Sequence, residues 1–256
     1  MRRAWPFALT LVVLASCGGS GEHSVTVLGK PAPFAGTVAR TTASRTVRFE
    51  QRTVLTVAGS TLQAAENGAA SLVARRAHVY KQLTSGGIPG EIVVIGAITY
   101  TNANVQAALN DPSVPPWTKL DTRKLNARER ANQADELGHA AAPAYLADGV
   151  AVPHRVAFFG TLTQYRGTVD PARLAKRLPA SVRPWVMNAV RADYPARPFM
   201  AQFWLDQQGR ARRVLVEYTT AKGSPVAIDT RYRAFGVAID VSLPPAGEIK
   251  DVTPRR

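Results

Sequence analysis

Residues 47–57, VRFEQRTVLTV, alternate apolar and polar side chains with the period of two that is typical of a β-strand. One face of this strand is apolar and carries Val47, Phe49, Leu55 and Val57. The other face is charged and carries Arg48, Glu50 and Arg52. A strand of this kind buries one side and leaves the other in water. The stretch therefore predicts a sheet that is covered on one face.

Further strands follow directly along the chain. Residues 77–84 and 91–101 have strand character, and the run Ile92-Val93-Val94-Ile95 is dense in β-branched side chains. Asn67-Gly68 is a strong signal for a hairpin turn, and Gly86-Gly87 predicts another turn. Together these segments predict a meander of about five antiparallel strands.

The middle of the chain predicts helices. Asn126 and Glu129 have the spacing of a capping box, and Gly138 is expected to end the helix that they begin. This helix is polar, with Leu137 as its one large aliphatic residue. A short, alanine-rich helix is expected to follow over 140–147.

A second helical segment and a second group of strands complete the pattern. Asp170-Pro171 predicts a helix start, and the apolar residues of 182–191 have the spacing of one helical stripe. Strands are expected on both sides of this segment, over 150–169 as two strands through Gly160, and over 199–205, 212–218, 227–234 and 237–241. The alternation of strands and helices predicts the α+β class, with one large, curved antiparallel sheet and helices covering one face.

The N-terminus has the order of a secretory signal. Arg2 and Arg3 precede an apolar run over 4–14, which is shorter than the roughly 20 residues that span a bilayer. Leu14, Ala15 and Ser16 then lead to Cys17, the one cysteine of the chain. This tetrad resembles the lipobox of bacterial lipoproteins, which implies a diacylglyceryl group on the Cys17 sulfur and cleavage before it. An ordinary signal peptide with an incidental cysteine is the alternative.

These observations divide the chain into three parts. We expect a signal peptide over 1–16, a lipidated Cys17 with a flexible tether rich in glycine and proline over 17–43, and a single folded domain over 44–256. The lipid would anchor the protein to the extracytoplasmic face of the cell membrane. We expect the protein to be a monomer.

The charge is strongly basic. Removal of Arg2 and Arg3 with the signal would leave 30 of the 32 basic residues against 18 acidic ones. The basic residues are spread along the chain, and no nucleic-acid recognition motif accompanies them, so a nucleic-acid partner is not expected. Two interpretations stay open: contact with anionic lipid headgroups, and an ordinary solvated surface.

The residue patterns that carry catalysis are absent from the sequence. None of the four histidines, His23, His78, His139 and His154, has a neighbour at metal-ligand spacing. The sequence also lacks a nucleophile elbow and a glycine-rich phosphate loop. We therefore expect neither an enzyme nor a bound metal or cofactor.

Several segments together resemble one protein family. They are 90–96 with Tyr100, Trp117 with Leu120-Asp121, 165–170, 203–206 closing on Gly209-Arg210, Phe235-Gly236, 243–245 and 251–253. Their order and spacing, over roughly residues 47–253, resemble the actinobacterial LppX/LprG-type lipoproteins, which are related in fold to the LolA lipoprotein carrier. The resemblance implies a half-open β-barrel of about ten or eleven strands whose open side is plugged by helices. It also implies an apolar cavity between sheet and helices that takes the acyl chains of a lipid.

The expected cavity would be lined by apolar residues of the inward sheet face. The candidates are Phe49, Leu55, Val57, Ile92, Val94, Phe158, Phe203, Leu205, Val214 and Val216, and the alternative for each is ordinary core packing. With an open cavity, the protein would bind or carry a phospholipid or glycolipid. The polar helix over 126–138 favours the other possibility, a sensor or interaction lipoprotein of the same fold with a filled cavity.

Overall fold

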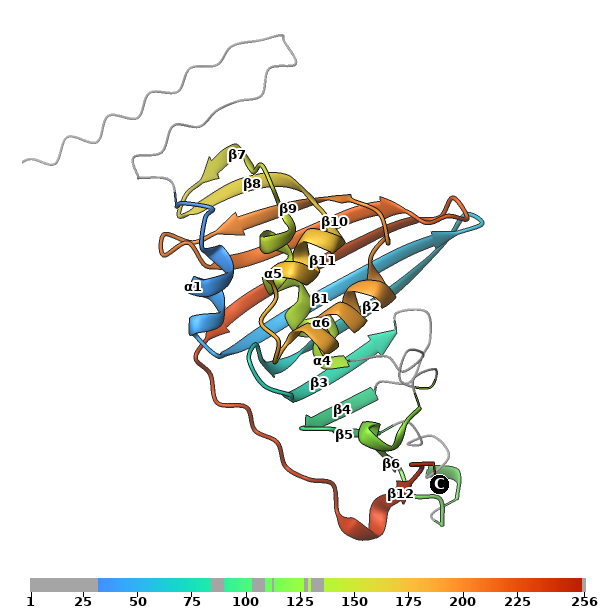
Figure 1. Cartoon of the computed structure of the whole chain (residues 1–256). Coiled ribbons are helices and arrows are strands. Elements are labelled where there is room, and N and C mark those ends of the chain that lie inside the picture. Colours follow the sequence, from blue (N-terminus) through green and yellow to red (C-terminus); the bar gives the residue numbers. More distant parts are fainter. Residues whose placement is uncertain are drawn as a thin grey trace, which may run out of the picture.

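The computed structural model describes residues 32–83, 90–102, 109–111, 113–126, 129 and 136–254. The predicted signal peptide and Cys17 lie outside these residues. Twelve strands form one sheet in the order β12-β6-β5-β4-β3-β2-β1-β11-β10-β9-β8-β7, which is open because β12 and β7 are its two edges (Figure 1). The strands are β1 Thr46–Val57, β2 Ser60–Ser71, β3 Arg76–Leu83, β4 Gly90–Ile95, β5 Ile98–Thr101, β6 Trp117–Asp121, β7 His154–Phe159, β8 Leu162–Val169, β9 Phe199–Leu205, β10 Ala211–Thr219, β11 Pro225–Phe235 and β12 Ile249–Asp251.

Helices cover one face of this sheet, which we call the inner face (Figure 1). They are α1 Thr37–Ala43, α4 Glu136–Tyr145 with the 3-10 turn η2 Leu146–Gly149, α5 Pro171–Arg177 and α6 Arg183–Asp193; the turns η1 Thr122–Lys124 and η3 Ala246–Glu248 lie elsewhere. The arrangement confirms the predicted α+β class. Two details differ from the prediction: the sheet has twelve strands, and β12 pairs with β6 in parallel, whereas the other described pairs are antiparallel.

Helix α4 is the centre of the inner layer. It contacts strands β2, β3, β4 and β10 on one side and α6 on the other. Its side chains are buried around the whole circumference, as in Leu137, Ala140, Ala142 and Ala144. The alanines let the helix axis approach the sheet closely, and a helix that is apolar on every side belongs in a core.

The predicted helix signals at the two later helices are confirmed. The Asp170 carboxylate caps α5 by accepting a hydrogen bond from the backbone N–H of Ala172 at 2.8 Å. In α6 the predicted apolar stripe is buried, and it consists of Val182, Trp185, Val186, Ala189 and Val190. The capping box is present as well, because Asn126 and Glu129 each accept a hydrogen bond from the other's backbone N–H, at 2.8 and 2.7 Å.

The predicted turn at Asn67-Gly68 is wrong. Both residues lie inside β2 and pair with β1 on one side and β3 on the other. The hairpin turns instead at Ala58 and Gly59, which have positive φ angles of 48° and 81°. Gly68 is needed for close approach rather than for turning, because a Cβ atom there would lie 2.0 Å from the carbonyl oxygen of His78.

Three other sequence expectations need correction. Residues 91–101 form two strands, since Gly96 with φ 59° turns the chain between β4 and β5. Gly138 does not end a helix but lies within α4, where it is buried against neighbouring elements. Residues 237–241 are not a strand; they cross the outer face of the sheet, and the carbonyl of Asp240 contacts His78 Nδ1 at 3.0 Å.

The folded domain includes Ala32 and does not begin at Ser44. The Ala32 carbonyl accepts a hydrogen bond from the hydroxyl of Tyr165 at 2.6 Å. Arg40 of α1 holds the incoming chain by donating to the carbonyls of Pro33 and Ala35, at 2.6 and 2.7 Å. Pro33 and Gly36, two of the residues that suggested a tether, therefore lie in a packed entry into the domain; the tether residues before Ala32 lie outside the described residues.

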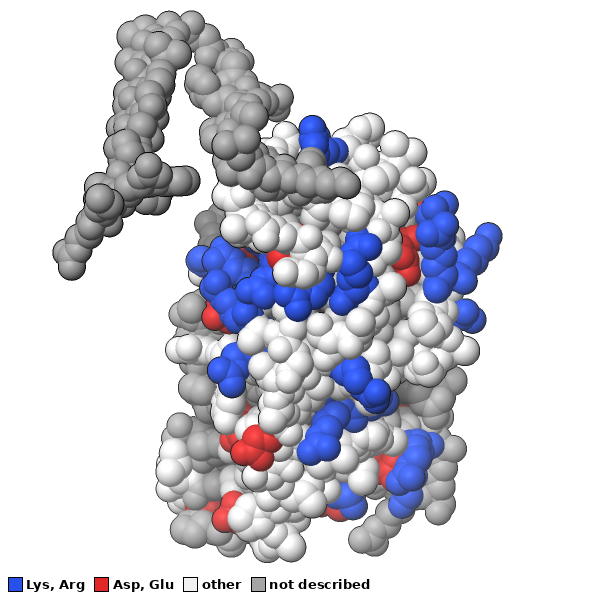
Figure 2. Space-filling model, turned by 90° about the vertical axis from the view of Figure 1, so that its left-hand side faces the viewer, with Lys and Arg blue, Asp and Glu red and all other residues white. Residues whose placement is uncertain are grey.

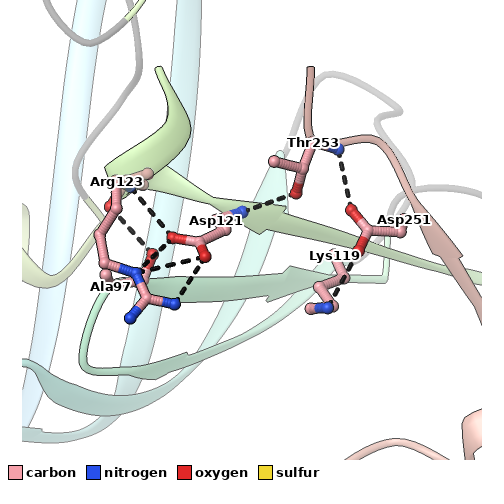
Figure 3. Close-up of polar contacts among 7 residues, drawn as sticks. Ala97, Lys119, Asp121, Arg123, Asp251 and Thr253 are labelled. Carbon is pink, nitrogen blue, oxygen red and sulfur yellow. Dashed lines mark hydrogen bonds and ion pairs between the residues drawn. The ribbon is translucent and has the colours of Figure 1, made fainter. Parts of the chain in front are cut away.

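A second, smaller core lies on the outer face. Val93, Tyr100 and Trp117 are buried there, and Val241 and Ile249 from the C-terminal segment pack against them. Polar contacts hold the segment in place (Figure 3): Thr253 Oγ1 accepts a hydrogen bond from the Asp121 N–H at 2.9 Å, and Asp251 pairs with Lys119 at 2.9 Å.

We expect acid to release β12. Hydrogen bonds from Arg123 lower the pKa of Asp121 to about 2, and hydrogen bonds from Thr253 and Lys119 lower the pKa of Asp251 further. A carboxylate whose pKa is lowered by folding stabilises the structure above its unfolded pKa of about 4, and this stabilisation is lost as the pH falls through the folded pKa. Amide hydrogen exchange should therefore show residues 249–251 protected at pH 4 and open only below pH 2, where Asp251 takes up its proton. Opening already at pH 5 would mean that other groups hold the strand.

Candidate functional site

The structure brings most of the predicted cavity residues together beneath the helices. Seven of them are fully buried in the main core, namely Phe49, Ile92, Val94, Phe203, Leu205, Val214 and Val216. Leu55 is half-buried at the edge of this core, whereas Val57 is 43% exposed. The side chain of Phe158 lies outside the described residues.

Side chains of α4 fill the centre of the inner face. The hydroxyl of Tyr232 on β11 donates to the carbonyl of Ala140 at 3.0 Å, and the hydroxyl of Tyr145 donates to the carbonyl of Leu72. Burial raises the pKa of both phenols, that of Tyr145 to about 12, so both stay protonated donors at neutral pH. These contacts tie α4 to the sheet on both sides of its axis.

Away from α4 an apolar row leads out of the core. Leu55 on β1 pairs with Leu62 on β2 and with Val226 on β11, and Val226 pairs with Tyr218 on β10. Directly paired residues project on the same face, so these four side chains form one row across four strands. Exposure rises along the row from 8% at Val226 to 46% at Leu62. In Figure 1 the β1–β2 and β10–β11 hairpins extend past the helices at this end.

The C-terminal end of α6 is fastened beside this row. The Asp193 carboxylate forms an ion pair with Nδ1 of His139 on α4, and both side chains are largely buried. The Asp193 carbonyl accepts a hydrogen bond from the hydroxyl of Tyr218 at 2.5 Å. Residue 193 therefore joins α6 to α4 and to the sheet, and we call these two contacts the Asp193 latch. The sequence alone does not reveal this latch, because its three residues come from segments far apart in the chain.

A pocket with both apolar and charged lining lies between α5, η2 and the segment that leads into α1. It has a volume of about 170 Å³ and contains Arg173 and Arg177 of α5 together with Asp148 of η2. The residues that lead into α1, from Phe34 to Thr37, form its rim. The sequence signal for this pocket was the pair Arg173 and Arg177, which follow the cap residue Asp170 at a spacing of i,i+4. The sequence predictions did not include these two residues.

Within the described residues, no group of three or more histidine, cysteine, aspartate or glutamate side chains lies close enough together to hold a metal ion. Among the described helices, none combines the length and the apolar character that a membrane crossing requires.

Among known proteins, the chain is similar only to solved structures. The sequence matches no family model and no curated protein. The complex of MucA and MucB from Pseudomonas aeruginosa is 13% identical with a TM-score of 0.31, and the match covers 77% of this chain and 56% of that one. A LolA superfamily protein from Nitrosomonas europaea is 9% identical with a TM-score of 0.30, covering 78% of this chain and 93% of that one. An outer membrane lipoprotein-sorting protein domain from Vibrio parahaemolyticus is 12% identical with a TM-score of 0.28, covering 78% and 91%.

Proposed function

We propose that this protein is an envelope lipoprotein that binds the acyl chain of a lipid between the inner face of its sheet and its helices. The observation that carries the proposal is the apolar row from Tyr218 to Leu62, which begins under the helices and ends in solvent. The open sheet with helices on one face is also the architecture expected from the resemblance to LolA-like lipoproteins.

An acyl chain suits this surface because it needs contact area and no hydrogen bonds. Leu62 and Val57 are large apolar side chains, 46% and 43% exposed, and they lie near each other at the tip of one hairpin. Covering such side chains is favourable by roughly 25 cal/mol for each Å² removed from water. A chain laid along the row would reach the end of α6, where the Asp193 latch would limit how far the helix can lift from the sheet.

The anchor is a second part of the proposal. Lipidation at Cys17 would hold the domain at the extracytoplasmic face of the membrane, where phospholipids and glycolipids are the available ligands. Binding and transfer of such a ligand require no catalytic group. Basic side chains on the surface would add attraction to anionic headgroups.

An interaction module without a lipid ligand is the second candidate. The tight filling of the inner face by α4, with Leu137 and four alanines fully buried, favours it. In that case the Asp193 latch would stay closed and partners would bind to the outer surface.

Native mass spectrometry of the protein extracted from its own membranes separates the two candidates. We expect a bound lipid mass, beyond any covalent lipid, that organic extraction removes and reloading with phospholipid restores. A protein that carries no lipid and takes up none of the phospholipids offered would contradict the carrier proposal and leave the interaction module.

We expect Leu62→Glu to lower phospholipid loading about tenfold, because a carboxylate within the apolar row would have to lose water when the acyl chain binds. Val156→Glu is the matched control, since Val156 is 45% exposed but lies on β7, away from the row. Both changes are at the surface and should alter the free energy of unfolding by no more than about 0.5 kcal/mol. Equal loading of the two variants would show that the row is not part of the binding site.

A further inference from the structure

The pocket of Arg173 and Arg177 has the features of a built anion site. Arg173 Nε is buried, and it has no hydrogen-bond partner within the part of the chain that the structure describes. A buried donor without a protein partner is uncommon in native proteins, and such a donor commonly binds a water molecule or an ion. The pocket volume of about 170 Å³ is well above the roughly 10–15 Å³ that a cavity needs to hold one water molecule.

The charges in the pocket are arranged for a bound anion. Arg173 and Arg177 follow one another on the same side of α5, and guanidinium groups bind phosphate oxygens through paired N–H donors. Asp148 faces both arginines, and burial raises the pKa of its carboxyl. The fixed groups of the pocket are therefore two guanidinium groups and one carboxyl group.

The pocket lies where phospholipid headgroups of a membrane could reach it. Its rim includes Phe34, which lies 17 residues after Cys17. If the proposed lipid anchor is present, a chain of that length reaches at most roughly 60 Å from the membrane. Figure 2 shows the side of the molecule on which α1 lies, and there lysine and arginine form a belt in which acidic residues are few. This belt would turn the same side toward an anionic membrane.

We propose that the pocket of Arg173, Arg177 and Asp148 binds a phosphate group, supplied either by a phospholipid headgroup at the membrane surface or by free phosphate. The site shares no residue with the acyl-chain row, so it does not depend on acyl-chain binding; only the headgroup source rests on the proposed lipid anchor.

The test uses the full chain carrying Cys17→Ala, so that no covalent lipid contributes to binding. Two probes are compared at 0.15 M salt: inorganic phosphate by calorimetry, and vesicles with and without phosphatidylglycerol by co-sedimentation. Arg173→Gln and Arg177→Gln should each weaken binding about tenfold, the effect of removing a charge-assisted hydrogen bond. Lys176→Gln is the matched control, because it removes the same charge from an exposed position of the same helix that does not line the pocket. Asp148→Asn should strengthen binding severalfold, since it removes the opposing charge.

The two probes identify the source. Loss of binding to both probes in the arginine variants means that the pocket takes phosphate from either source, and loss confined to vesicles means that it takes a headgroup. Equal loss in Lys176→Gln would overturn the proposal and leave only diffuse surface attraction. No binding of either probe would overturn the proposal and the surface attraction together. Lipid loading measured by native mass spectrometry should be unchanged in all four variants, which keeps this result distinct from a failure of acyl-chain binding.

Discussion

Replacement of Gly68 by alanine should lower the free energy of unfolding by about 3 kcal/mol, which for a domain of this size lowers the melting temperature by about 10 °C. The new Cβ atom would lie 2.0 Å from the carbonyl oxygen of His78 and within 3.0 Å of the Val79 Cα atom. Both are backbone atoms of β3, so the clash cannot be relieved by a side-chain rotation. The pairing of β2 with β3 must shift instead. Chemical denaturation monitored by circular dichroism measures the effect.

Gly90→Ala is the matched control for this change. Gly90 is also paired within the sheet, but a Cβ atom there has no neighbour within 4 Å. The variant should differ from the wild type by no more than about 0.5 kcal/mol. If Gly68→Ala were as stable as Gly90→Ala, the register between β2 and β3 described above would be wrong.

Asp193→Ala should destabilise the protein by about 2 kcal/mol and loosen α6 from α4 and the sheet. The substitution leaves His139, which is largely buried, without its carboxylate partner, and one partner of a buried ion pair is costly to leave alone. Hydrogen exchange should increase first in α6, and phospholipid should load faster because the opening beside the apolar row forms more often. Urea denaturation and a loading time course measure the two effects.

A double-mutant cycle with His139→Ala isolates the ion pair from other losses at residue 193. A coupling energy above about 0.5 kcal/mol is expected for side chains in direct contact. Tyr218→Phe removes only the hydroxyl that donates to the Asp193 carbonyl, so it should show a weaker version of the same phenotype. Additive effects of Asp193→Ala and His139→Ala would show that the pair of His139 and Asp193 contributes nothing to the closed state.

Local signals predicted the parts of this fold that are decided locally. The Asp170 cap, the capping box of Asn126 and Glu129, and the stripe of α6 all depend on residues within a few positions of one another. The alternation in β1 likewise identified its buried face, with Val47 and Phe49 fully covered.

The wrong sequence predictions have a common cause: contacts with residues far away in the chain determined the local structure. Asn67-Gly68 has the composition of a turn, yet the backbone of β3 explains the glycine. Gly138 would end an isolated helix, but burial of α4 between sheet and α6 lets the helix continue through it. The entry segment around Gly36 appeared to be a linker because its contacts, such as that of Arg40 with the Gly209 carbonyl, join residues far apart in sequence.

The candidate site was predictable only in part for the same reason. Period-two patterns showed which apolar residues share the inner face, but not which of them α4 covers and which lie beyond it. The Asp193 latch and the Arg173 pocket each combine residues from separate elements, and a sequence shows such groupings only after the topology is known.

The pairing of β1 with β11 has a consequence for how the molecule is made. Gln51 and Thr230, joined by a hydrogen bond in the middle of the sheet, are 179 residues apart in the chain. Contacts of such long range slow folding, because the loop entropy is lost before the contact forms. Two local meanders, β1 to β5 and β7 to β11, can each assemble early, but the seam that unites them must wait until β11 has been synthesised. If the chain is exported through a membrane, each half would present an unpaired strand edge during transit, and a chaperone that shields such edges would determine the yield of native protein.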